Sequence, residues 1–109
     1  PWIVCHADLP LLRADDLVRA LDLMQAGAWV VAPSSDGGTS LIGGVGDFDF
    51  AFGPGSFHRH LARLASRSVR VLASVGTLLD LYTAADFRAA AAHPRGGWLQ
   101  EAATIPSDV

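Results

Sequence analysis

An α/β domain, with helices packed on a layered sheet, is the fold class that this sequence predicts. Short apolar runs at 2–7 and 28–32 are typical of strands buried inside a sheet. Between them, the segment 13–26 carries apolar residues at helical spacing. Strands and helices that alternate along a chain form layered α/β sheets. With 109 residues, half of them apolar, the chain is long enough for one modest core.

The first two elements can be assigned in some detail. The run 2–7 shows little alternation of polar and apolar residues, which predicts a central parallel strand covered on both faces. The helix expected at 13–26 has Asp15 and Asp16 near its start, where the helix dipole favours negative charge. Gly27 follows its last turn, as is common at the end of a helix.

Further elements continue the alternation. Apolar or alternating runs predict strands at 28–32, 39–42, 48–52, 69–73 and 78–82. Helices are expected at 56–67, with Ser56 as N-cap, and at 84–92, after a capping sequence that begins at Thr83. We therefore expect one domain over 1–92 and a tail without clear periodicity over 93–109.

Charge and apolar patterning exclude several classes of protein. A formal charge of −3, with eight arginines scattered along the chain, argues against a nucleic-acid binder. No apolar stretch approaches the ~20 residues that a membrane helix needs, and no signal peptide is visible. Cys5 is the single cysteine, so no internal disulfide can form, which indicates a cytoplasmic setting. The chain opens at Pro1 directly into a strand-like run, so we expect a missing N-terminal half.

Two carboxylates are candidate ligands for a hard cation. Asp8 follows the first apolar run, and Asp80 interrupts a later one, where an unpaired charge is costly. Ligands of layered α/β sheets bind beyond the carboxyl ends of the strands, so the two acids can share a site. Mg²⁺ prefers one or two carboxylates together with phosphate oxygens and water. A structural role stays open, in which Asp8 caps the next helix or accepts hydrogen bonds from loop amides.

Two glycine-containing loops are candidate anion sites. The segment 34–39, Ser-Ser-Asp-Gly-Gly-Thr, offers hydroxyls and backbone amides, and 53–56, Gly-Pro-Gly-Ser, leads directly into a helix N-terminus. An ordinary turn and a plain N-cap are the alternatives. His60 shares a face with apolar residues of the same helix, so we expect it to be hydrogen-bonded and partly buried. No nucleophile triad is recognisable.

Four segments occur in a characteristic order. They are Asp-Leu-Pro at 8–10, the Ser-Ser-Asp-Gly-Gly-Thr loop at 34–39, Gly-Pro-Gly-Ser-Phe at 53–57 with His60, and Leu-Asp-Leu-Tyr-Thr at 79–83. Together they resemble the 2-phospho-L-lactate guanylyltransferases, which make the guanylylated phospho-acid intermediate of the deazaflavin coenzyme F-420; some members use phosphoenolpyruvate instead. The resemblance covers about residues 2–90, and its most specific part is the segment 53–57.

The resemblance implies a fold, a reaction and a role for each matching residue. The fold is a nucleotide-diphospho-sugar-transferase-like (Rossmann-like) three-layer sheet, present here in part. The reaction transfers GMP from GTP to 2-phospho-L-lactate or phosphoenolpyruvate and releases pyrophosphate. Asp8 and Asp80 are the implied catalytic ligands of Mg²⁺, whereas Thr39, Gly53 and Ser56 are implied to hold the phospho-acid.

The sequence departs from the family pattern in two ways. Tyr82 stands where the family has a second acid of the late motif, and a phenol is a poor ligand for Mg²⁺ at neutral pH. The glycine-containing nucleotide loop and basic segment of the preceding half are also absent, so we expect a missing N-terminal half or a homo-oligomer to complete the site. The alternative is a degenerate nucleotidyltransferase-like domain with a role in binding or assembly.

Overall fold

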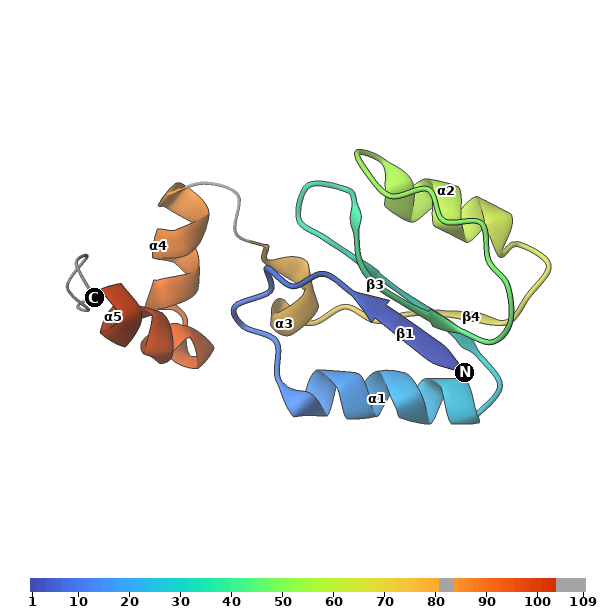
Figure 1. Cartoon of the computed structure of the whole chain (residues 1–109), viewed down its shortest axis with the longest axis horizontal. Helices are drawn as coiled ribbons and strands as arrows, with labels where there is room; N and C mark the ends of the chain where they lie inside the picture. The colour runs from blue at the N-terminus through green and yellow to red at the C-terminus, as the bar shows by residue number, and fades with distance from the viewer. Residues whose placement is uncertain (81–83, 104–109) are drawn as a thin grey trace.

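The structure is a computed structural model that describes residues 1–80 and 84–103. A four-stranded mixed sheet forms its centre (Figure 1). The strands are β1 (Trp2–Cys5), β2 (Trp29–Pro33), β3 (Thr39–Gly44) and β4 (Val69–Val71), in the order β1-β3-β2-β4. β3 runs antiparallel to both β1 and β2, whereas β4 runs parallel to β2. The strands expected at 28–32, 39–42 and 69–73 are thus confirmed.

The position expected for the first strand was wrong. β1 lies at an edge of the sheet and is antiparallel to β3, instead of being central and parallel. Its residues are only partly buried, and Val4 is exposed. An unbroken apolar run does not distinguish a strand covered on both faces from an edge strand, because both accept apolar residues on a packed face. Here Trp2 supplies the packing, with its ring edge against Trp29 at 5.6 Å between centroids.

Helices cover both faces of the sheet, which gives the three layers that were expected. α1 (Ala14–Gln25) packs on one face and α2 (Ser56–Arg63) on the other (Figure 1). Alternate residues of β2 enter the two cores: Val30 and Ala32 face the α1 side, and Trp29 and Val31 face the α2 side. Each fully buried aliphatic side chain contributes about 1.5–3 kcal/mol, so these strands anchor both layers.

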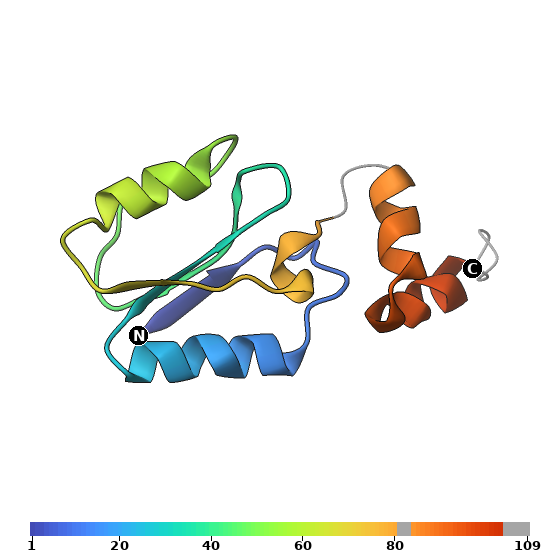
Figure 2. The same cartoon turned by 180° about the vertical axis from the view of Figure 1, so that it is seen from behind.

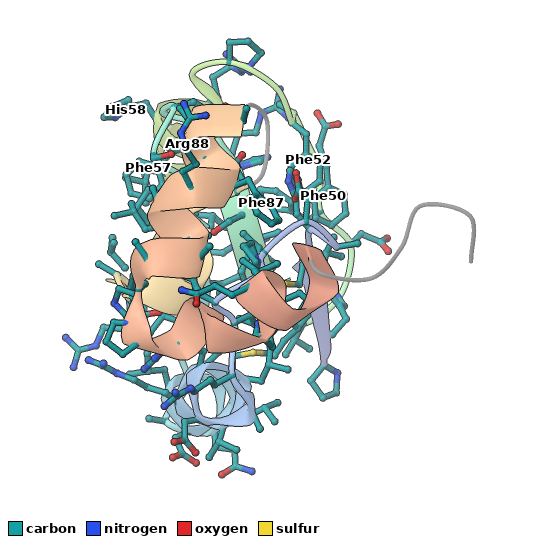
Figure 3. The ribbon with its side chains drawn as sticks, turned by 90° about the vertical axis from the view of Figure 1, so that its left-hand side faces the viewer. Phe50, Phe52, Phe57, His58, Phe87 and Arg88 are labelled. Atoms are coloured by element: carbon teal, nitrogen blue, oxygen red, sulfur yellow. The ribbon has the colours of Figure 1, made fainter. Side chains whose placement is uncertain are left out.

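The segment 48–52 is not a strand, although its alternating sequence predicted one. It forms no ladder with the sheet, and its phenylalanines pack on each other instead. The rings of Phe50 and Phe52 are stacked, with 5.5 Å between their centroids. Figure 3 labels both side chains. Phe48 packs against the Trp29 ring. Aromatic clustering therefore explains the alternation that suggested a strand.

The strand expected at 78–82 is also wrong within the described residues. A short helix, α3 (Val75–Leu78), follows β4, and Leu79 and Asp80 continue in an irregular path. Gly76 lets α3 lie close to α1. A Cβ at this position would lie 2.1 Å from an Asp16 carboxylate oxygen, so only glycine fits there. Tyr82 lies outside the described residues.

The C-terminal region contains more regular structure than its sequence predicted. α4 (Ala84–Ala92) is confirmed, but the expected tail also forms the 3-10 turn η1 (Pro94–Gly96) and the helix α5 (Gly97–Ala103). Figure 2 shows α4 and α5 at one end of the molecule. Leu99 packs with Leu11 and Ala90 in a third apolar cluster. No helix in the described ranges is long and apolar enough to cross a membrane.

A buried carboxylate connects this C-terminal region to the sheet. Asp16 accepts hydrogen bonds from the Arg13 backbone N–H at 2.9 Å, which caps α1, and from the Ser74 hydroxyl at 2.9 Å. Arg95 of η1 places Nη1 3.2 Å from Asp16 Oδ2. Because a buried charge is costly without such partners, Asp16 fixes three segments relative to one another.

We expect Asp16→Asn to lower the free energy of unfolding by about 1–3 kcal/mol, since it removes a buried charge and leaves Arg95 without its partner. Asp15→Asn is the matched control, because Asp15 lies in the same first turn but is exposed. Denaturant titration of both variants measures the difference. Equal losses would show that Asp16 acts only through the helix dipole.

Candidate functional site

A pocket opens where the loops after β1 and β2 meet the segments before α2 and after α3. Its lining consists of polar side chains and glycine-rich backbone: His6, Asp8, Ser34, Asp36, Gly38, Thr39, Gly53, Pro54 and Asp80. Four of the five residues singled out from the sequence thus come together: Asp8, Thr39, Gly53 and Asp80. The fifth, Ser56, has no exposed surface and lies behind Thr39, to which its hydroxyl is hydrogen-bonded.

Three carboxylates line this pocket, those of Asp8, Asp36 and Asp80. Asp8 is partly exposed and lies 4.0 Å from the ring nitrogen Nδ1 of His6. Asp80 is buried, and its carboxylate accepts a long hydrogen bond of 3.4 Å from the Ser35 hydroxyl. Burial raises the pKa of Asp80, and the negative charges of Asp36, Asp8 and Asp86 raise it further. The pocket is therefore short of positive charge.

Asp36 is a site residue that the sequence reasoning missed. Its carboxylate accepts hydrogen bonds from the Ser34 hydroxyl and from the Gly38 N–H, the latter at 3.0 Å. These bonds lower the pKa of Asp36. The sequence feature that could have indicated this is the position of Asp36 in the loop 34–39, because an Asp in a turn commonly accepts a hydrogen bond from the backbone N–H two residues later. His6, to which the sequence analysis assigned no role, lies just beyond β1 and also lines the pocket.

The carboxylates suit a cation that is shared with a ligand. Within the described ranges, no three His, Cys, Asp or Glu side chains gather closely enough to enclose a metal. A pocket lined by Asp8, Asp36 and Asp80 is compatible with Mg²⁺, which takes one or two carboxylates and completes its shell with phosphate oxygens and water.

Hydroxyl and backbone groups also line the pocket. Thr39, at the start of β3, lies in hydrogen-bond contact with Ser56 Oγ at 2.9 Å and with His60 Nδ1 at 2.8 Å. The expectation for His60 is confirmed as to hydrogen bonding, and its burial is complete instead of partial. Thr39, Ser56 and His60 therefore form one buried set of hydrogen-bonded side chains, and Thr39, its middle member, lines the pocket.

The backbone of the segment 49–55 is held by side chains of α2. The Arg59 guanidinium donates to the carbonyl oxygens of Pro54 at 2.7 Å and Ala51 at 3.0 Å. Arg63 donates to the Asp49 carbonyl and pairs with its carboxylate at 3.4 Å. Gly53 has φ +116°, a conformation that side-chain-bearing residues rarely adopt. Its position on the pocket wall is thus specified by the helix behind it.

A three-layer α/β domain whose pocket combines acids, hydroxyls and glycine backbone has the features of a nucleotidyltransferase. A family model described as "Guanylyl transferase CofC like" matches residues 1–101. The chain belongs to this family.

Curated relatives carry related names. The chain is 39% identical over 67 residues to the phosphoenolpyruvate guanylyltransferase of Roseiflexus castenholzii, a match that covers 60% of this chain and 30% of the relative. It is 34% identical over 102 residues to the 2-phospho-L-lactate guanylyltransferase of Methanothermobacter thermautotrophicus, covering 91% of this chain and 46% of the relative. The chain thus spans less than half the length of either relative.

Asp80→Asn is expected to stabilise the chain at neutral pH in the absence of divalent cations. The folded-state pKa of Asp80 is raised above its ordinary value of 3.8, so the folded state binds more protons than the unfolded state between those two values. Stability is accordingly lost as the pH rises through the raised pKa, and an amide avoids this loss. The advantage of the variant should shrink as the pH falls toward 3.8.

Asp36→Asn is the matched control, because the pKa of Asp36 shifts in the opposite direction. Its carboxylate contributes stability above pH 3.8, and that stability is lost as the pH falls through the lowered pKa. Thermal unfolding at several pH values measures both variants. Destabilisation of the chain by Asp80→Asn at neutral pH would contradict the expected direction.

Proposed function

We propose that this chain supplies the metal- and phospho-acid-binding part of a guanylyltransferase. The complete enzyme transfers GMP from GTP to 2-phospho-L-lactate or phosphoenolpyruvate and releases pyrophosphate, as a step in the biosynthesis of the deazaflavin coenzyme F-420. The observation that supports this most directly is the pocket that gathers Asp8 and Asp80 together with Thr39 and Gly53. Membership of the guanylyl transferase family and the names of the relatives agree with it.

The proposed reaction depends on positioning and charge. A phosphate oxygen of the phospho-acid attacks the α-phosphorus of GTP, a new phosphoanhydride bond forms, and the bond to pyrophosphate breaks. Asp8 and Asp80 would hold Mg²⁺, which would neutralise negative charge on the phosphates. Thr39 and the backbone at Gly53 orient the phospho-acid, with Ser56 behind Thr39. No covalent enzyme intermediate is required.

The proposed acceptor is a class of phospho-acid, because both candidates offer the same groups to the pocket. Both carry a phosphate and a carboxylate on adjacent atoms, so both satisfy the hydroxyl and backbone donors of the wall formed by Thr39 and Gly53. Two of the relatives, both from Roseiflexus, are named for phosphoenolpyruvate and one for 2-phospho-L-lactate. We therefore propose the shared class, a small 2-phospho-carboxylic acid, as the acceptor.

Asp8→Asn is expected to weaken Mg²⁺-dependent binding of phosphoenolpyruvate by at least about tenfold, because one anionic ligand of a shared cation is lost. Isothermal titration of the 109-residue chain with phosphoenolpyruvate, with and without Mg²⁺, measures this directly. Asp22→Asn, an exposed carboxylate of α1, is the matched control and should bind like the unaltered chain.

The titration also separates the proposal from its alternative. Binding that requires both Mg²⁺ and Asp8 supports a working site. No binding at all would favour a degenerate domain with an assembly role, for which Tyr82 in place of an acid is the supporting observation. Transfer itself is tested with the protein in its full natural length, GTP and each phospho-acid, by mass spectrometry of the guanylylated product. Absence of that product at saturating GTP and Mg²⁺ would exclude the reaction.

A further inference from the structure

His60 is buried at the centre of the α2 side and touches the pocket only through other residues. It has no exposed surface, and the rings of Phe48 and Phe52 lie 5.6 and 5.2 Å from its own. Its two ring nitrogens make different contacts. Nε2 accepts a hydrogen bond of 2.9 Å from the Ala51 backbone N–H, and Nδ1 lies 2.8 Å from the Thr39 hydroxyl.

These contacts determine which nitrogen carries the proton. A backbone N–H can only donate, so Nε2 must present a lone pair to Ala51. The proton of a neutral imidazole then resides on Nδ1, which donates to Thr39 Oγ1. Burial, followed by the positive charges of Arg63 and Arg59, lowers the pKa of His60 and favours this neutral form.

The tautomer of His60 in turn limits which hydrogen bonds the hydroxyls of Thr39 and Ser56 can make. Thr39 Oγ1 already accepts from His60, so it has one further lone pair and its own proton. If Ser56 donates into that lone pair across 2.9 Å, the Thr39 proton is left for a third partner. Thr39 lines the pocket, whereas Ser56 is fully buried, so an anion in the pocket that accepts this proton selects the Ser56-to-Thr39 direction.

We propose that His60 is a positioning residue: its Nδ1–H occupies one lone pair of Thr39 Oγ1, so that Thr39 can accept from Ser56 through the other and present its own hydroxyl proton to an anionic phospho-acid in the pocket. This inference rests on the proposed function for the nature of the ligand. It adds a residue that does not touch the substrate, with a defined tautomer and a defined direction of hydrogen bonding.

His60 has a second, structural contact that has to be separated from the first. Its bond to Ala51 helps to hold the segment 49–55 and therefore Gly53, as do the two bonds from Arg59. Two amide substitutions of His60 separate its contact with Thr39 from its contact with Ala51. Asn places its amide nitrogen near the position of Nδ1 and preserves donation to Thr39, whereas Gln places its amide oxygen near Nε2 and preserves acceptance from Ala51.

We expect His60→Gln to raise the KM for the phospho-acid roughly tenfold with little change in the KM for GTP, because donation to Thr39 is lost. His60→Asn should keep a KM close to that of the unaltered enzyme. His58→Gln, on the exposed side of the same helix (Figure 3), is the matched control and should change neither value. The assays use the full natural length, with circular dichroism to confirm that each variant is folded.

The outcomes are distinguishable. An active unaltered enzyme in which His60→Asn loses affinity as much as His60→Gln would overturn the positioning role and leave only a packing role for the ring. An unaltered enzyme without activity would instead refute the proposed function. Nitrogen-15 spectroscopy of the folded chain needs no variant: a protonated Nδ1 with a bare Nε2 at His60 supports the inference, and a proton on Nε2 overturns it.

Discussion

The buried carboxylate of Asp16 is the interaction on which the arrangement of the pocket depends. A charge inside a protein requires partners, and Asp16 obtains them from the start of its own helix, from Ser74 beyond β4, and from Arg95 of η1. The first of these sets where α1 begins and hence where the loop carrying Asp8 ends. The second sets where α3 begins and hence where Asp80 emerges. One buried acid with a structural role therefore places two acids that line the pocket.

The part of the pocket at Gly53 is organised by α2. The side chains of Arg59, His60 and Arg63 bond backbone groups of the segment 49–55. That segment forms no ladder with the sheet, and the helix and a cluster of aromatic rings hold it instead.

Sequence patterns predicted the elements whose signals are local. α1, β3 and α4 have caps, glycines or apolar periods that identify them within a few residues. The patterns failed where contacts between side chains decide the structure. The alternation at 48–52 reflects aromatic rings that pack on one another. The chain at 75–80 is not a strand, and its Gly76 lies against Asp16, which is sixty residues earlier in the chain. Asp8 and Asp80 were singled out because one follows an apolar run and the other interrupts one, whereas the roles of Thr39, Gly53 and Ser56 came only from the resemblance of their segments to a known family. Asp36 was included only as part of the candidate anion loop 34–39, and no pattern gave its carboxylate a role of its own.

The contact between Asp16 and Arg95 also has a consequence for how the chain reaches this structure. Its two residues are 79 positions apart, so the ion pair closes nearly the whole described chain into a loop. Contacts with such separation are made late, after the entropy of loop closure has been overcome by the local helices and the sheet. During synthesis, Asp8 and Asp16 leave the ribosome long before Arg95 does. The buried carboxylate of Asp16 therefore obtains its charged partner only after most of the described chain has been synthesised.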